Sequence, residues 1–124
     1  MADFLHDDVF DSGLSVLDTL VENLYICSSL PTTFTEASST YKLGTKANPT
    51  VSAPADRTGG GRKVTVSAIT DGTVSGTGTA GFYALTDDSA SKLLAQGDLS
   101  STQAVTSGNT FTLTAFDIGI PDPA

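Results

Sequence analysis

A chain of 124 residues is long enough for one domain with its own hydrophobic core. Hydrophobic residues make up 39% of it, charged residues only 16%, and Ser and Thr together number 33, which is typical of all-β proteins because Thr and Val suit a half-buried pleated surface. The net charge of −8 argues against direct binding to nucleic acid, because such binding needs clustered cations that replace counterions.

The charges are segregated along the chain. Residues 1–22 carry six acids and no Lys or Arg, residues 42–63 carry five bases against one acid, and residues 64–124 carry six acids against Lys92. This pattern suits head-to-tail contacts between copies or docking on a charged partner, and it equally suits three solvated surfaces with no further role. No signal peptide and no membrane span are expected, because no basic start precedes an apolar run and no apolar run is long enough to cross a bilayer.

The first predicted element is a helix over residues 8–21. Its apolar residues recur alternately four and three positions apart: Phe10, Leu14, Leu17, Val21 and Leu24. Asp7 or Asp8 can cap its start. Residues 1–7 then form an acidic N-terminal arm, and the apolar stripe is expected to pack against the protein's own sheet.

Short elements follow the helix. Residues 24–27 predict a strand, and Pro31 then breaks it. Residues 33–39 predict one helical turn, since Thr33 and Glu36 have the spacing of a capping box. Residues 44–63 contain two prolines and three consecutive glycines, so we predict a long and irregular loop there.

Residues 63–120 are predicted to form a strand-rich body. A strand over residues 63–69 is followed by Asp71-Gly72, which is a strong hairpin signal. The returning strand over residues 73–79 is rich in glycine and predicts a sheet edge or a site of close packing. A strand over residues 81–86, a turn at residues 87–89, a strand over residues 92–99 and a short strand from residue 104 come next.

The last predicted strand, residues 110–120, changes the parity of its apolar side chains. One set has odd numbers and the other even numbers: Phe111, Leu113 and Ala115, then Phe116, Ile118 and Ile120. A β-bulge near Ala115–Phe116, or a strand that passes from one packing layer to another, explains the change. If both faces of this strand are apolar, one packs the core while Ile118 and Ile120 on the other meet a neighbouring subunit.

These elements together predict a single, mainly β domain over residues 1–124. We expect a small antiparallel β-sandwich with one N-terminal helix laid against one face or end, and extended terminal and loop arms.

Residue types that carry catalysis or bind metals do not form a recognisable set. His6 is the only histidine, and a metal site needs three or four ligands. Cys27 is the only cysteine and lies among apolar neighbours, which predicts a buried structural thiol. The run Gly59–Lys63 lacks the spacing of a phosphate-binding loop. It is either a flexible hairpin tip or a basic arm that reaches an acidic neighbour.

Carboxylate pairs are the remaining catalytic alternative. Asp87 with Asp88, and Asp117 with Asp122, could serve a hydrolase if each pair faced across a cleft, but turn and surface roles suit them better. We therefore expect no enzyme, no cofactor and no metal. Partner contacts are expected from the N-terminal arm, the basic end of the loop and the last strand: Asp3, Phe4, Leu5, Arg57, Arg62, Lys63, Ile118 and Ile120.

Three runs carry a family resemblance: LYICSSLPTTFTEA at residues 24–37, Asp56-Arg57 through the glycines to RKVTV at residues 56–66, and GNTFTLTAFDIGIP at residues 108–121. They are similar to a family of small virion structural proteins of tailed bacteriophages, encoded among the head genes near the major capsid protein. No motif of this family assigns a role to an individual residue.

The resemblance implies a capsid decoration (cement) protein. Such a protein, made in the host cytoplasm, sits on the outer surface of the capsid as a homotrimer and clamps major capsid protein subunits without covalent bonds. It binds neither nucleic acid nor membrane directly. The alternative that the resemblance leaves open is a tail, head–tail or fibre component with an adhesion role.

Overall fold

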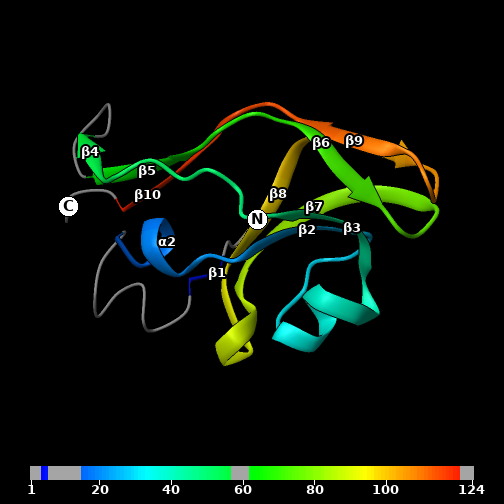
Figure 1. Ribbon diagram of the computed structural model, residues 1–124, viewed down its shortest axis with the longest axis horizontal. Helices are drawn as coiled ribbons and strands as arrows, with labels where there is room; N and C mark the ends of the chain where they lie inside the picture. The colour runs from blue at the N-terminus through cyan, green and yellow to red at the C-terminus, as the bar shows by residue number, and fades with distance from the viewer. Residues whose placement is uncertain (1–3, 6–14, 57–61, 121–124) are drawn as a thin grey trace.

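A computed structural model describes residues 4–5, 15–56 and 62–120 of the chain, and it has the expected mainly β fold with antiparallel sheets and a short N-terminal helix (Figure 1). The main sheet has seven strands in the order β1-β8-β7-β2-β3-β6-β9. These strands are β1 (Phe4–Leu5), β2 (Asn23–Cys27), β3 (Lys42–Ala47), β6 (Ile69–Val74), β7 (Gly78–Asp87), β8 (Lys92–Val105) and β9 (Thr110–Leu113).

The second sheet lies at one end of the molecule (Figure 1). Its three strands, in the order β10-β5-β4, are β4 (Ala55–Asp56), β5 (Arg62–Val66) and β10 (Phe116–Ile120). The helical elements are α2 (Ser15–Leu20), the π-helix η1 (Glu36–Thr40) and the 3-10 helix η2 (Asp88–Ala90).

A long bent ribbon of two chain segments joins the two sheets. One segment is β5 followed by β6, and the other is β9 followed by β10; they run side by side along one edge of the molecule (Figure 1). Val66 pairs with Phe116 on one side of the bend and Ile69 pairs with Leu113 on the other. The parity change at Ala115–Phe116 is therefore a passage from one sheet to the other, the second of the two predicted explanations.

The main core lies between the two sheets and α2. Leu17 of α2 is fully buried, and it shares one apolar cluster with Val64 and Val66 of the second sheet and with Ile26 and Leu85 of the main sheet. Burying a side chain of this size contributes about 1.5–3 kcal/mol. The helix therefore packs against its own sheets, as its stripe predicts. It ends at Leu20, close to the predicted end, and residues 8–14 lie outside the described residues.

A smaller cluster covers the opposite face of the main sheet, where Tyr25 and Cys27 of β2 pack with Ala37 of η1. The run at residues 24–27 is thus apolar throughout because β2 is buried on both faces. The predicted helical turn is present. Thr33 Oγ1 accepts from the Glu36 N–H at 3.1 Å, as in a capping box. The Glu36 carboxylate, however, accepts from the N–H of Thr32 at 2.9 Å, whereas in a capping box it would accept from the N–H of Thr33.

Two predictions based on glycine were wrong. Residues 44–63 are not a continuous loop, because β3 is an interior strand and Val51 forms a β-bridge to Val66. Gly44 allows a close approach inside β3: a Cβ there would lie 2.7 Å from the Thr73 carbonyl oxygen. Asp71-Gly72 is not a hairpin turn but lies within β6, where Gly72 is opposite Phe111.

The remaining turns follow prediction more closely. The turn at residues 87–89 leads into η2, and Gly108 has a positive φ of 91° in the turn at residues 107–109. The strands expected at residues 92–99 and from residue 104 are one continuous strand, β8, because its middle section bulges instead of turning.

Candidate functional site on the second sheet

Four of the eight residues predicted to contact a partner lie on one strand pair. In the β5–β10 ladder, Arg62 is opposite Ile120, and Lys63 and Ile118 lie in adjacent rungs, opposite Gly119 and Val64. Phe4 and Leu5 are not part of this group, because they form β1 and pair with Gln96 and Ala95 of the main sheet. Asp3 and Arg57 lie outside the described residues.

The two faces of the β5–β10 pair differ sharply. Val64, Val66 and Ile118 face the core, whereas Lys63 and Asp117 occupy alternate positions on the outer face. Ile118 is only 7% exposed. The prediction that it meets a neighbouring subunit was therefore wrong, because both sides of the parity change pack into the protein's own two-layer core.

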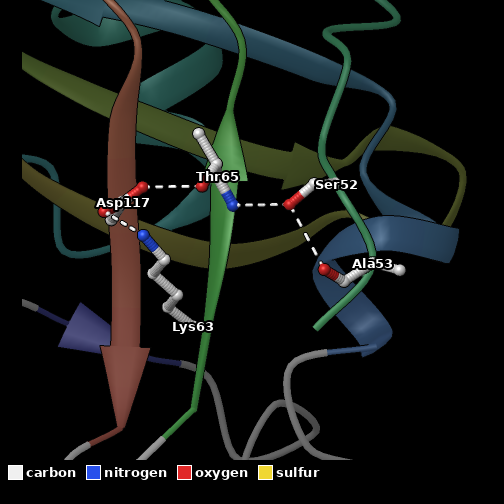
Figure 2. A network of polar contacts seen from close by, with 5 residues as sticks. All are labelled: Ser52, Ala53, Lys63, Thr65 and Asp117. Carbon is white, nitrogen blue, oxygen red and sulfur yellow. Dashed lines mark hydrogen bonds and ion pairs between the residues drawn. The ribbon is translucent and has the colours of Figure 1, made fainter. Parts of the chain in front are cut away.

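A polar network holds the side chains of the outer face (Figure 2). Lys63 Nζ lies 3.0 Å from Asp117 Oδ2, and Thr65 Oγ1 donates to Asp117 Oδ1 at 2.7 Å. The Thr65 N–H donates to Ser52 Oγ at 2.9 Å, and Ser52 Oγ in turn donates to the Ala53 carbonyl at 3.2 Å. The network thus crosses from β10 through β5 to the segment before β4.

The electrostatics of this network favour an ionised carboxylate. The Thr65 hydroxyl and then the Lys63 ammonium stabilise the charged form and lower the pKa of Asp117. The Lys63 side chain is 29% exposed and that of Asp117 is 49% exposed, so solvent screens their pairing. Exposed ion pairs contribute about 0–1 kcal/mol. The network therefore does more to fix side-chain positions than to stabilise the fold.

Sequence reasoning identified Lys63 but missed Asp117, Thr65 and Ser52 as its neighbours. The alternation of Thr65 with Val64 and Val66 was visible, and so was the position of Asp117 next to Ile118. The missing information was the register between β5 and β10, which are far apart in the chain.

A second polar cluster surrounds the turn between β7 and β8. The Tyr25 hydroxyl donates to Asp88 Oδ2 at 2.6 Å and Thr86 Oγ1 donates to Asp88 Oδ1. The Ser89 N–H and hydroxyl both donate to the Glu22 carboxylate at 2.7 Å. These bonds tie the turn to β2 and to the residues that precede it.

The cluster has shifted acid–base properties. Burial would raise the pKa of Asp88, but the hydrogen bonds from Thr86 and Tyr25 outweigh it and lower the pKa. Burial, and then the bond to Asp88, raise the pKa of Tyr25. Of the carboxylates considered for a hydrolase, Asp88 accepts hydrogen bonds that hold this turn, and Asp117 belongs to the polar network of the second sheet. Asp122 lies outside the described residues.

Cys27 is a buried thiol, as predicted. Its Sγ lies 3.7 Å from the Ala37 carbonyl oxygen, and burial raises its pKa to about 12. Within the part of the chain that the structure describes, no three His, Cys, Asp or Glu residues are grouped so that they could hold a metal ion. No described helix is long and apolar enough to cross a membrane.

Comparisons of the chain with protein-family models, with curated proteins and with solved structures gave no match.

Proposed function

We propose that this protein is a structural component of a tailed-phage virion that decorates the outer surface of the capsid and clamps neighbouring major capsid protein subunits without covalent bonds. The outer face of the second sheet carries the proposal. Two of the three runs that resemble decoration proteins, residues 56–66 and 108–121, supply the adjacent strands β5 and β10 there.

The chemistry of this face suits a clamp. Binding costs about 0.5–1.5 kcal/mol for each flexible side chain that must be immobilised. Lys63, Thr65 and Asp117 already contact one another, so their mutual contacts offset part of this cost before a partner binds. They present one cation, one carboxylate and one hydroxyl, which can bind polar groups of either charge.

The location on the virion is the first test. Gold-labelled antibody on intact virions should mark the whole head surface, whereas labelling confined to the tail or to fibres would contradict the proposal. Virions that lack the protein should lose resistance to heat and to chelating agents. Unchanged resistance would contradict the reinforcing role.

The binding face is the second test. Lys63→Ala should weaken co-sedimentation of the purified protein with capsid shells about three- to tenfold. The upper end of this range corresponds to a loss of about 1.4 kcal/mol in binding free energy. Lys46→Ala is the matched control, because Lys46 Nζ also lies 3.0 Å from a carboxylate, that of Asp71 on the main sheet. Equal effects of both substitutions would show that net charge, and not this face, governs binding. Sedimentation of the free protein would test the homotrimer that the family resemblance implies.

A further inference from the structure

A gap separates β8 and β9, two strands of the main sheet that are not hydrogen-bonded to each other along their backbones. Among the strands that the structure describes, β9 pairs with β6 alone, and β8 pairs with β1 only at Ala95 and Gln96. One side-chain hydrogen bond crosses the gap, from Gln103 Nε2 to the Thr112 carbonyl at 2.6 Å. We call the gap between Asp98–Gln103 and Thr110–Leu113 the β8–β9 seam.

A wide bulge shapes the β8 side of this seam. Gln103 is opposite Ala80 and Asp98 is opposite Phe82, so the four residues from 99 to 102 lie opposite Gly81 alone. Such an insertion bends a strand away from its partner and re-aims its side chains.

The bulge and the end of β9 line a cavity of about 260 Å³. Its apolar lining includes Leu99, Leu113 and the rings of Tyr83 and Phe116, which pack with centroids 4.5 Å apart. Serine and threonine residues line it too, and Asp98 is the one charged residue among the described residues that line it. The cavity therefore suits an aliphatic side chain of a bound segment that carries a positively charged residue next to it in sequence.

The edge of β9 offers backbone hydrogen bonds to the seam. The Thr112 carbonyl points into it, because it accepts from Gln103 there. The N–H and C=O groups of one strand residue point to the same edge, so the N–H of Thr112 points there too, as do the backbone groups of Thr110. Asn109 has the opposite parity, and its carbonyl accepts from the Val74 N–H on the β6 side at 2.9 Å.

This edge carries none of the charges or prolines that usually prevent pairing, although β9 is only four residues long. Exposed edge strands generally carry Lys, Pro or inward-pointing charges that prevent them from adding another strand. Residues 110–113 read Thr-Phe-Thr-Leu and contain none of these. The second sheet differs, since its edge strand β4 is two residues long, follows Pro54 and ends at Asp56.

We propose that the β8–β9 seam is a strand-addition site for an extended, basic segment of a partner protein. The segment displaces the Gln103 side chain from the Thr112 carbonyl and pairs with Thr110 and Thr112. It inserts one aliphatic side chain into the cavity and places a Lys or Arg beside Asp98. A second copy of this chain is the competing occupant, because its residues 42–63 carry five bases against one acid, and self-association of the free protein that Thr112→Pro abolishes in sedimentation would overturn the proposal. The inference does not depend on the capsid proposal, because any protein with such a segment satisfies it.

The test selects nine-residue peptides from a displayed random library against the full-length protein and measures their affinity by fluorescence anisotropy. Selected peptides should be rich in Val, Ile and Thr, contain Lys or Arg, and lack Pro. Thr112→Pro removes one N–H from the seam and none from the β6 pairing, so it should weaken binding at least about tenfold. Unchanged affinity, or a library that yields no binder, would overturn the proposal.

Charge reversal provides a second readout that does not strain the backbone. Asp98 is exposed, so Asp98→Lys should fold normally and should select acidic peptides in place of basic ones. Asp18→Lys on α2 makes the same charge change at another exposed position and should leave the selection unchanged. Identical peptides from both variants would show that Asp98 does not contact the bound segment.

Discussion

Gly72 is the position where one added methyl group tests the packing of the main sheet most sharply. A Cβ at Gly72 would lie 2.2 Å from Phe111 Cε1 and 2.3 Å from its Cζ. Non-bonded carbon atoms prefer about 3.5–4.0 Å, so the Phe111 ring must move by more than about 1 Å. The ring has little room, because it is 2% exposed and a Cβ at Gly44 would already be 3.0 Å from it.

The expected cost of Gly72→Ala follows from these contacts. Overpacking a well-packed core costs about 1–3 kcal/mol. The reduced conformational freedom of the unfolded chain returns about 0.4–1 kcal/mol. We expect a net loss of about 1–2 kcal/mol in the free energy of unfolding, which corresponds to a fall of about 4–10 °C in Tm for a domain of this size.

Urea and thermal denaturation of four variants would check this reasoning: Gly72→Ala, Phe111→Leu, Gly72→Ala/Phe111→Leu and Gly81→Ala. In Gly72→Ala/Phe111→Leu the ring is gone, so the cost of adding the methyl group should fall by at least about 1 kcal/mol relative to the wild-type background. Gly81→Ala is the matched control, because the nearest atom to a Cβ there is Thr102 Cγ2 at 3.6 Å, an ordinary contact. If Gly72→Ala and Gly81→Ala had equal effects, the contact between ring and glycine would not be the reason for this residue.

Three further predictions concern titration, reactivity and surface charge. The pKa of Asp88 is lowered below its ordinary value of 3.8, so the stability that its ionised form contributes is present above that pH and is lost as the pH falls through the lower folded value. Asp88→Asn should therefore flatten the dependence of the urea midpoint on pH below about pH 4. A curve parallel to that of the wild type would contradict the prediction. The Cys27 thiol, with its pKa raised to about 12, should react with a disulfide reagent at pH 8 at least about 100-fold more slowly in the native protein than in urea, and equal rates would show that it is accessible. Lys63→Ala and Lys46→Ala should each change the free energy of unfolding by less than about 1 kcal/mol in denaturation experiments, because both ion pairs are exposed; a larger loss for Lys63 would give its network a structural role.

Local patterns in the sequence predicted much of this fold because they report directly on burial. The alternation in residues 63–69 predicted one strand, of which residues 63–66 lie in β5 while Ile69 begins β6. The apolar run at residues 24–27 marks a strand that is covered on both faces. The parity change at Ala115–Phe116 predicted either a β-bulge or a passage between layers, and the structure has the passage, with Val66 opposite Phe116 in one sheet and Ile69 opposite Leu113 in the other.

Glycine was the main source of error, because one residue type serves two physical purposes. Asp71-Gly72 has the composition of a hairpin turn, yet Gly72 is there to receive an aromatic ring from the neighbouring strand. Gly44 likewise predicts a loop, whereas in β3 it leaves room for the same Phe111 ring. Distinguishing the two roles requires the identity of the residue on the adjacent strand, and this depends on long-range pairing.

The candidate site was predictable only in part, for the same physical reason. Lys63 stood out as a basic residue, but its proposed role in binding a partner depends on Asp117, which the β5–β10 register brings beside it. The expected role of Ile118 was wrong because an apolar residue at a parity change can face either a partner or the protein's own second layer. Here the second layer is present, and Ile118 packs with Val64 and Val66.

The second-sheet face and the β8–β9 seam are two consecutive parts of one chain segment. Thr112 lies at the seam, and five residues later the same segment supplies Asp117 to the outer face, with only Thr114 and Ala115 between β9 and β10. A strand added at the seam would stiffen β9 by pairing its free edge. Since β10 follows directly, this would also hold the Lys63–Asp117 network in place. A partner that used both sites would therefore bind each one more tightly than two separate partners could. The entropic cost of ordering the β9–β10 segment would arise once for both contacts.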